Sequence, residues 1–317
     1  MRAEAGQRGP EVRSDCWVEV RPAASDTPTL NLTSRVAALY GAAIARLAHA
    51  TFERLGAADL DLTIDDSGAL PYVIQARIEA AVKRLRPDLT AEVLPDIRLQ
   101  RAPTPRAGLR RSRLYLPGDT PKFFINAGLH RPDGVILDLE DSVALAEKDS
   151  ARLLVRNALC AVDFYGAEVT VRVNALPAGL DDLRALAPHG VQAFVLPKVE
   201  MADEIVAAAQ ALEGAGPIHL IPIIESARGV FNALAIASAS ERVAALSIGL
   251  EDYTADIGAT RTAEGRESLW ARSQIVNAAR AAGVQPLASV YADVDDPDGL
   301  ARFAAEARAF GDRKSVV

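Results

Sequence analysis

The sequence predicts an α/β protein in which a (β/α)8-type barrel, without its eighth strand, follows a small α+β domain. Two observations favour this architecture. After residue 110, short apolar runs alternate with helical stretches, a pattern typical of repeated strand–helix units around a parallel sheet. Two of the runs are followed at once by a carboxylate, Glu225 and Asp252. Strand ends with polar groups are expected at the end of a barrel where active sites lie.

The first 85 residues predict the small α+β domain. Segments 17–20, 30–32 and 60–64 alternate like half-buried strands, and segments 36–55 and 70–85 have helical periodicity. Gly56 is placed to cap the first helix, and segment 65–68 is a turn. We assign this domain to residues 1–85.

Residues 86–110 predict a linker. They contain four prolines with little apolar periodicity, and proline fixes φ and interrupts helices. We expect a semi-rigid connection between two domains here.

Residues 111–317 carry the strand–helix pattern of the barrel. The predicted strands are 113–116, 134–137, 169–173, 193–196, 219–224, 245–248 and 285–290, and predicted helices include 147–159, 201–212 and 269–282. A closed barrel of this kind needs an eighth strand. It would start just after Phe310-Gly311, where the sequence ends, so we expect an incomplete barrel from a truncated reading frame.

Composition excludes several classes of function. The formal net charge is −7 and no basic patch with interleaved aromatics occurs, which argues against nucleic-acid binding. No apolar run approaches the roughly 20 residues needed to span a bilayer, and the N-terminus lacks the apolar segment of a signal peptide. Cys16 and Cys160 lie far apart without metal-ligand spacing. Free thiols fit a reducing cytoplasm.

Glu225 and Asp252 are the strongest candidate site residues. They lie 27 residues apart, about one strand–helix unit, so they should stand at neighbouring strand ends. Two hard oxygen ligands with room for water and substrate suit Mg²⁺. Acidic residues also favour helix N-termini, so spacing alone leaves metal ligation and helix capping open.

Residues 110–311 resemble the β subunit of citrate lyase, within the citrate lyase and malyl-CoA lyase aldolase family. Six strings carry the resemblance: RRSRLYLPG (110–118), DGVILDLEDSVALAEKDSAR (133–152), VTVRVNAL (169–176), VLPKVE (195–200), IPIIESARGV (221–230) and IGLEDY (248–253). Their order and spacing over some 200 residues make the match specific. The resemblance implies a TIM-type barrel.

The resemblance also implies roles for individual residues. It makes Glu225 and Asp252 the ligands of Mg²⁺, and Arg172 the residue that holds a substrate carboxylate or carbonyl oxygen. It places Asp138 in a supporting position, where it would orient metal-bound waters or Arg172.

Three further positions complete this prediction. Pro117-Gly118 ends the first strand of the barrel, and its backbone could pass close to a ligand. Lys198 follows the fourth strand, where a ligand contact and a surface position remain open. Ser226 lies in no nucleophile pattern, and we expect it to cap a helix.

Residues 9–85 resemble the citrate lyase acyl carrier protein, the γ subunit, through LTIDDSGALPYVIQARIEAAVKRL (62–85), LYGAAIARL (39–47) and RSDCWVEVR (13–21). The resemblance implies a phosphoribosyl-dephospho-CoA group on a serine two residues before Asp15. A gapless match puts Arg13 there, and arginine cannot carry the phosphodiester. Either a one-residue slip makes Ser14 the acceptor, or the carrier is unloaded and structural.

The two resemblances together imply a fused carrier and citryl-ACP lyase. Its reaction would be a Mg²⁺-dependent retro-Claisen cleavage of a citryl thioester to oxaloacetate and an acetyl thioester. The family also implies a homo-oligomer and a citrate lyase α subunit as partner. Two alternatives remain: a CoA-thioester lyase for malyl-CoA or citramalyl-CoA with a vestigial carrier, and a non-catalytic carrier or assembly subunit.

Overall fold

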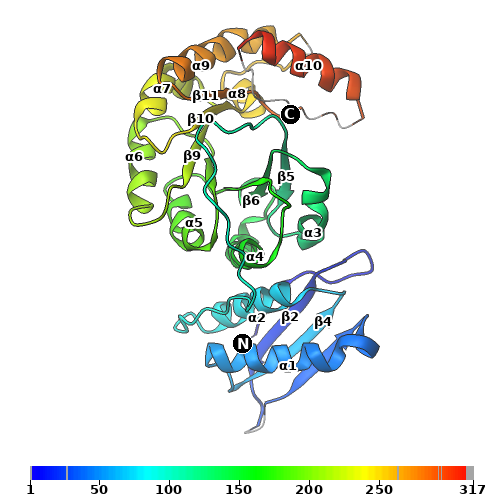
Figure 1. Cartoon of the computed structure of the whole chain (residues 1–317). Helices are drawn as coiled ribbons and strands as arrows, with labels where there is room; N and C mark the ends of the chain where they lie inside the picture. The colour runs from blue at the N-terminus through cyan, green and yellow to red at the C-terminus, as the bar shows by residue number, and fades with distance from the viewer. Residues whose placement is uncertain (1, 26–27, 263, 292, 294, 312–317) are drawn as a thin grey trace. The chain divides into compact units, whose positions relative to one another are not determined.

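The computed structural model describes residues 2–25, 28–262, 264–291, 293 and 295–311 (Figure 1). They form two compact units. The first unit draws on Met1–Gln100, Leu116–Leu129 and Asp141–Phe164, and the second on Arg101–Tyr115, His130–Glu140 and Tyr165–Val317. Because the two units interleave along the chain, domain boundaries at residues 85/86 and 110/111 stay a prediction.

The first unit contains a four-stranded sheet with the order β1-β2-β4-β3. Its strands are β1 (Ala3–Gly6), β2 (Cys16–Pro22), β3 (Leu30–Ser34) and β4 (Leu60–Asp66), and its long helices are α1 (Ala37–Leu55) and α2 (Pro71–Leu85). Only the β3–β4 pair is parallel. The predicted elements are all present, and Gly56 ends α1 in the left-handed region with a φ of 69°. Strand β1 was missed.

The same unit includes two helices from further along the chain, α3 (Phe124–Ala127) and α4 (Lys148–Ala161). Its apolar core is continuous from Val18 and Ile64 in the sheet to Ile78 on α2, and Leu153 of α4 packs against it. Residues 86–110 contain no helix or strand, as predicted. Val93 in this segment is nevertheless fully buried in the core, so the segment is partly anchored.

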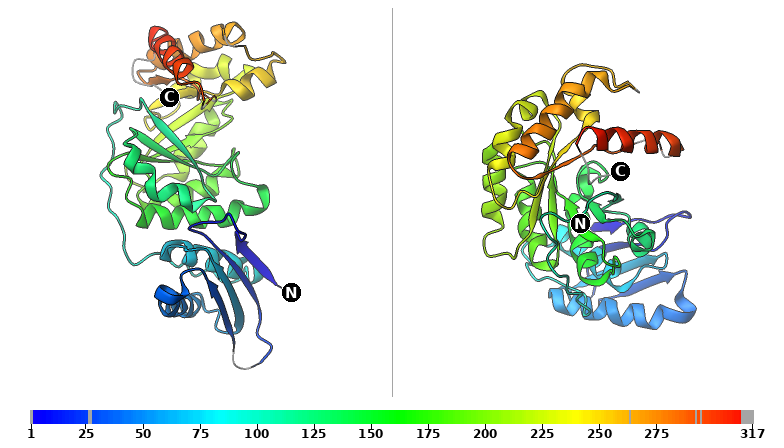
Figure 2. Two further views of the ribbon diagram at one scale, coloured as in Figure 1. Left: turned by 90° about the vertical axis from the view of Figure 1, so that its right-hand side faces the viewer. Right: turned by 45° about the horizontal axis from the view of Figure 1, so that its top comes forward.

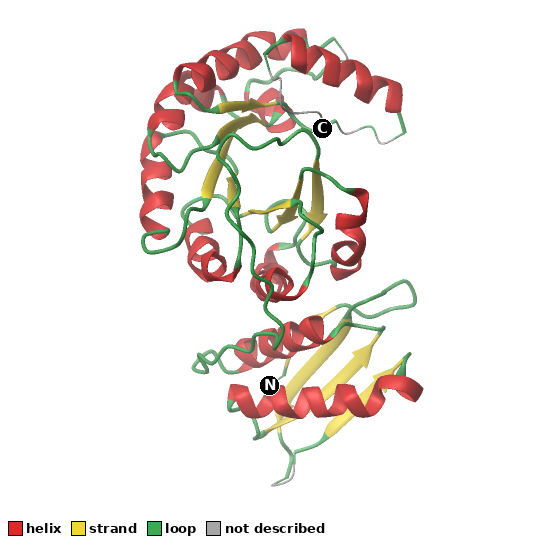
Figure 3. Cartoon of the chain, viewed as in Figure 1, coloured by secondary structure: helices red, strands yellow, loops and turns green. Residues whose placement is uncertain are grey.

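The second unit is built on a seven-stranded sheet with the order β11-β10-β9-β8-β7-β6-β5 (Figures 2 and 3). Its strands are β5 (Arg113–Pro117), β6 (Gly134–Asp138), β7 (Glu168–Arg172), β8 (Ala193–Leu196), β9 (His219–Ile224), β10 (Ala245–Ile248) and β11 (Gln285–Leu287). Its helices are α5 (Gly179–Leu186), α6 (Ala202–Ala211), α7 (Ala227–Ser238), α8 (Leu250–Asp256), α9 (Leu269–Ala281) and α10 (Pro297–Ala309). Figure 1 shows α5, α6, α7 and α9 outside the curved sheet.

All seven predicted barrel strands are present, and two details differ. Strand β11 is shorter than predicted, because it lies at the edge of the sheet and pairs only with β10. The carbonyl of Ala288 just beyond it accepts a hydrogen bond from the Arg113 side chain at 2.8 Å. Helix α10 was not predicted. The predicted eighth strand falls on residues 312–317, outside the described residues, so a closed barrel stays a prediction. Across the described part of the chain, no helix has the length and apolarity to cross a bilayer.

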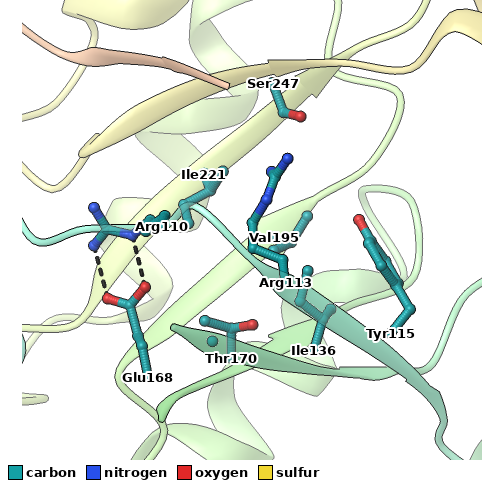
Figure 4. Close-up of a pocket in the computed structure, with 10 residues that line it drawn as sticks. Arg110, Arg113, Tyr115, Ile136, Glu168, Thr170, Val195, Ile221 and Ser247 are labelled. Carbon is teal, nitrogen blue, oxygen red and sulfur yellow. Dashed lines mark hydrogen bonds and ion pairs between the residues drawn. The ribbon is translucent and has the colours of Figure 1, made fainter. Parts of the chain in front are cut away.

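The interior of the sheet is apolar in its middle and polar at one end. Ile136, Val195, Ile221, Ala245 and Leu287 form a buried cluster against which Tyr115 packs. Towards the amino-terminal strand ends lies a buried ion pair (Figure 4). The guanidinium of Arg110 donates to both carboxylate oxygens of Glu168 at 2.6 and 2.7 Å. These residues border a cavity of about 10 Å³, room for one water molecule at most.

Replacement of Arg110 by methionine should lower the free energy of unfolding by roughly 3–5 kcal/mol, because it leaves the Glu168 carboxylate buried without its counter-ion. Chemical denaturation measures this loss. The matched control is Arg111→Met, since Arg111 pairs with Asp133 but its side chain is 56% exposed. That pair should contribute less than about 1 kcal/mol. Equal losses in the two variants would contradict the prediction.

Candidate active site

Five neighbouring strands of the second unit each end next to a charged side chain. Asp138 and Arg172 are the last residues of β6 and β7, and they are register partners in the parallel pair. Lys198, Glu225 and Asp252 follow β8, β9 and β10 within a few residues. Carboxyl ends of parallel strands meet at one edge of a sheet, so the topology gathers these groups into one site.

Glu225 directly follows β9 and is buried, with 8% of its surface exposed. Its Oε1 accepts a hydrogen bond from the backbone N–H of Lys198 at 2.9 Å. On its other side lies Gly249, where a Cβ atom would stand 2.7 Å from Oε2. A glycine after β10 therefore leaves the space that the carboxylate occupies.

Asp252 lies in the first turn of α8, with its side chain 45% exposed. Its carboxyl group is a near neighbour of that of Glu225. Burial raises the pKa of Glu225 to about 7, and the hydrogen bond and charge of Asp252 and the charge of Glu140 act in the same direction. A bound cation beside Glu225 would favour its ionised form and so oppose these effects.

Lys198 is in contact with the same carboxylates. Its φ is +55°, an uncommon value for a residue with a side chain. In this conformation the backbone N–H of Lys198 binds Glu225, while its Nζ lies 2.9 Å from Oε1 of Glu140 and 3.5 Å from Oδ2 of Asp252. Lys198 therefore lies among the carboxylates of the site, and a contact with a ligand stays a prediction.

Arg172 is fixed in place by three bonds to two carboxylates. Its Nε and Nη2 donate to the two oxygens of Asp138 at 2.6 and 2.8 Å, and its Nη1 lies 2.9 Å from Glu140. Its guanidinium also lies over the ring of Tyr115, 5.3 Å from the centroid. Burial opposes the charged form, but the hydrogen bond and charge of Asp138 raise the pKa of Arg172 above its usual range. Arg172 is therefore a permanent, oriented cation.

The charge balance of this cluster fits a divalent cation. Asp138, Glu140, Glu225 and Asp252 supply four carboxylates, against the two cations Arg172 and Lys198. When all are ionised the net charge is −2, which one Mg²⁺ would balance. The described residues hold no group of three or more acidic, histidine or cysteine side chains placed around one ion. Mg²⁺ suits such a site, because it often binds one or two carboxylates and keeps several waters.

Four other residues were named in the sequence analysis. Ser226 is the N-cap of α7, and its Oγ accepts from the Gly229 N–H at 3.1 Å, so the expected capping role is confirmed. Pro117 and Gly118 belong to the first unit, where Pro117 ends β5, and their role in substrate binding stays a prediction. Ser14, in the first unit, is half-buried with a φ of 59°, two residues before β2.

Sequence reasoning missed two residues of the site, Tyr115 and Gly249. Both lie inside motifs that were noted for other reasons: Tyr115 in the run that forms β5, and Gly249 between β10 and the EDY string. The contacts that give them a role are with Arg172 and Glu225, residues 57 and 24 positions away. No local pattern encodes such contacts.

Substitution of Gly249 by alanine should weaken Mg²⁺ binding about 10–100-fold with little loss of stability. The new methyl group would overlap Oε2 of Glu225, the mobile end of a side chain, and so displace the carboxylate without moving backbone. Isothermal titration with Mg²⁺ measures the effect. Gly216→Ala is the control, because a Cβ there meets no atom within 4 Å. An unchanged affinity for Mg²⁺ in Gly249→Ala would show that Glu225 is not a ligand of the metal.

Comparison with known proteins identifies the family. Residues 111–317 match the family model of the HpcH/HpaI aldolase/citrate lyase domain. The chain belongs to this aldolase/citrate lyase family. The citrate lyase β subunit of Leuconostoc mesenteroides subsp. cremoris is 40% identical over 204 residues, which cover 61% of this chain and 68% of that protein. Human mitochondrial citramalyl-CoA lyase is 35% identical over 251 residues, covering 73% of this chain and 74% of the relative.

Solved structures of family members share the fold. The citrate lyase β subunit of Mycobacterium tuberculosis, in complex with oxaloacetate and magnesium, superimposes with a TM-score of 0.57 at 34% identity. The match covers 66% of this chain and 91% of that one. Another structure of the M. tuberculosis protein, with magnesium, acetoacetate and coenzyme A, gives the same TM-score and identity over 67% of this chain and 76% of that one.

The N-terminal region matches a second model. Residues 5–85 match the ACP family, described as the malonate decarboxylase delta subunit. The prediction of an acyl-carrier-like domain fused to a citrate lyase β-like domain is therefore confirmed.

Proposed function

We propose that this family member is a Mg²⁺-dependent carbon–carbon lyase that cleaves a citryl thioester, carried on its own N-terminal domain, to oxaloacetate and an acetyl thioester. The observation that carries the proposal is the pair of neighbouring carboxylates Glu225 and Asp252 at the strand ends that also carry the fixed guanidinium of Arg172. The M. tuberculosis relative with bound oxaloacetate and magnesium supports the choice of metal and product. The carrier-like domain supports the choice of thioester.

Each residue of the site has a proposed role. Glu225 and Asp252 would hold Mg²⁺, and the ion would supply Lewis-acid polarisation of the substrate alcohol and the adjacent carboxylate. Arg172, held by Asp138 and Glu140, would bind a second substrate carboxylate through a fixed fork of donors. Lys198 would keep the charges of Glu140 and Asp252 partly balanced while the substrate enters.

The proposed reaction is balanced without a redox partner. The tertiary hydroxyl loses its proton and becomes the ketone of oxaloacetate. The bond between that carbon and the carbon α to the thioester breaks, and its electron pair goes to the thioester fragment. Protonation of this fragment gives the acetyl thioester. In this proposal Arg172 would stabilise the negative charge that develops on an oxygen during bond cleavage.

The proposal includes the carrier function and its partners. Ser14 would carry a phosphoribosyl-dephospho-CoA arm, since its side chain is partly exposed at the start of β2 and Arg13 cannot form the phosphodiester. A homo-oligomer and an α subunit that exchanges acetyl for citryl on the arm would complete the system. Intact mass and peptide mapping of residues 9–21, on protein from its native host, test the modification directly.

A second candidate is a lyase for free CoA thioesters. The identity to human citramalyl-CoA lyase favours it, and so does the arginine at position 13. Turnover with carrier-bound citryl, citryl-CoA, malyl-CoA and citramalyl-CoA separates the two candidates through their keto-acid products. Oxaloacetate released fastest from the carrier-bound substrate supports the first candidate. The absence of Mg²⁺-dependent keto-acid release from all four substrates would overturn both.

A further inference from the structure

The guanidinium of Arg77 on α2 joins three separate segments of the first unit. Its side chain is 1% exposed. Nε and Nη2 donate to the two carboxylate oxygens of Asp15 at 3.0 and 2.8 Å. Nη1 donates to Oγ of Ser150 at 2.7 Å, and Nη2 also donates to the carbonyl of Asp119 at 2.8 Å. The fork geometry of arginine is required for this arrangement, since a lysine has a single point of charge.

The bond to Asp15 fixes the segment that contains Ser14. Asp15 accepts from the Cys16 N–H through Oδ1, and its own carbonyl accepts from Ser67. The N–H of Ser14 donates to the carbonyl of Ser67 at 3.0 Å. Upstream, the guanidinium of Arg35 donates to the carbonyls of Gly9 and Val12 at 2.7 and 3.0 Å. Residues 9–15, the Ser14 loop, are therefore held at both ends.

The other two partners of Arg77 belong to strand-to-helix connections. Asp119 follows the end of β5 by two residues, and Ser150 lies in the first turn of α4, after the connection from β6. In parallel α/β folds such connections lie beyond the carboxyl ends of the strands, the end that carries active sites. Both partners of Arg77 therefore belong to segments of the first unit that follow a strand of the parallel sheet in the chain.

Further charged contacts hold α2 against α4. Arg84, seven residues after Arg77, donates to Asp149 at 2.8 Å and to the carbonyl of Ala146 at 2.8 Å. Between them in sequence, Glu79 is fully buried and accepts from the Arg156 guanidinium at 2.7 and 3.1 Å. Breaking a buried ion pair leaves uncompensated charges in the interior. The contacts of Arg84 and Glu79 with α4 therefore oppose sliding or separation of the two helices.

We infer that Arg77 is a positioning residue, which fixes the Ser14 loop against Asp119 and Ser150 so that a thioester arm is presented from a docked domain. The inference rests on the proposed carrier role of Ser14. The carrier-like domain then acts without swinging away from α4. In the competing view Arg77 has a purely structural role, and its replacement would lower the turnover of all substrates equally.

Variants of the full-length chain test the inference by hydrogen exchange and by single-turnover release of oxaloacetate. Arg77→Lys keeps the positive charge but removes the planar guanidinium that binds Asp15, Asp119 and Ser150 together. Ser150→Ala removes only the link to α4 and leaves the Asp15 pair intact, which keeps the test valid if the first variant folds poorly. Arg86→Lys is the matched control on the exposed end of the same helix, where Arg86 pairs with Asp59 and Asp88.

Arg77→Lys and Ser150→Ala should each slow release from citryl loaded on the chain's own arm about tenfold or more, because small misplacements of a reactant are costly. Their turnover of free citryl-CoA should stay within about twofold of wild type. Amide exchange should accelerate together in residues 9–15 and 148–152, and the Arg86→Lys control should change neither readout. Equal losses on both substrates, or unchanged exchange in both variants, would overturn the inference.

The exchange readout does not depend on catalysis. If the wild-type chain releases no oxaloacetate, the proposed function fails, and coupled exchange in the two segments still decides whether Arg77 docks the loop.

Discussion

Glu225→Gln is expected to abolish lyase turnover and, at the same time, to stabilise the metal-free protein above pH 7. Glutamine cannot supply the anionic oxygen that Mg²⁺ requires, so turnover should fall at least about 10³-fold. The second effect follows from the pKa of Glu225, which burial raises to about 7 from an ordinary 4.5. The stabilising effect of the protonated form is complete below pH 4.5 and is lost as the pH rises through about 7.

Denaturation in the presence of a chelator, at pH 5 and pH 8, measures the stability effect. The wild-type protein should lose up to a few kcal/mol between these values, and the Glu225→Gln variant should lose less, because its side chain carries no charge at either pH. Glu213→Gln is the control, since Glu213 is exposed on the surface. If Glu225→Gln keeps the turnover of the wild type, Glu225 is not a ligand of the metal. Equal pH dependence of stability in the wild-type protein and the Glu225→Gln variant would contradict the prediction that burial raises the pKa of Glu225.

Arg172→Lys is expected to reduce turnover by about 10²–10³-fold while the protein stays folded. Lysine keeps the charge but cannot donate to both oxygens of Asp138 and reach Glu140 in one geometry. The loss should appear mainly in kcat, since the oriented donors are proposed to stabilise charge that forms as the carbon–carbon bond breaks. Steady-state kinetics with saturating Mg²⁺ measures kcat and KM separately.

The companion variant for Arg172 is Asp138→Asn, which keeps the shape of the orienting side chain but removes its charge. It should lower kcat by a smaller factor, because Asp138 acts through Arg172. Turnover within threefold of wild type in Arg172→Lys would rule out the assigned role. A change confined to KM would make Arg172 a binding residue only.

Local periodicity was enough to predict most of the fold. The strands β6 to β10 are short, mostly buried runs between helices, so hydrophobic pattern marks their position. Local periodicity did not predict the elements whose structure depends on pairing with a neighbouring strand. The Ala-Glu-Ala-Gly run of β1 has low strand propensity and is a strand because β2 pairs with it. Strand β11 ends early because it is an edge strand.

The carboxylate pair of the site could also be predicted, since each member follows an apolar run directly. The Asp138–Arg172 contact was expected only from the family resemblance, because spacing along the chain does not show that two side chains at strand ends meet. The contacts of Lys198, Gly249 and Tyr115 depend on backbone conformation and on distant partners. The buried pairs Arg77–Asp15 and Arg110–Glu168 join residues 62 and 58 positions apart, beyond any local pattern.

The irregular segment 86–110 has a consequence for stoichiometry and kinetics. It makes the carrier-like and the citrate lyase-like regions parts of one polypeptide, so each chain is synthesised with one of each. Covalent linkage keeps the two parts together at any concentration of the protein in solution. Cleavage of a substrate on the chain's own arm would therefore be independent of dilution, whereas a separate carrier subunit would need a collision for every turnover.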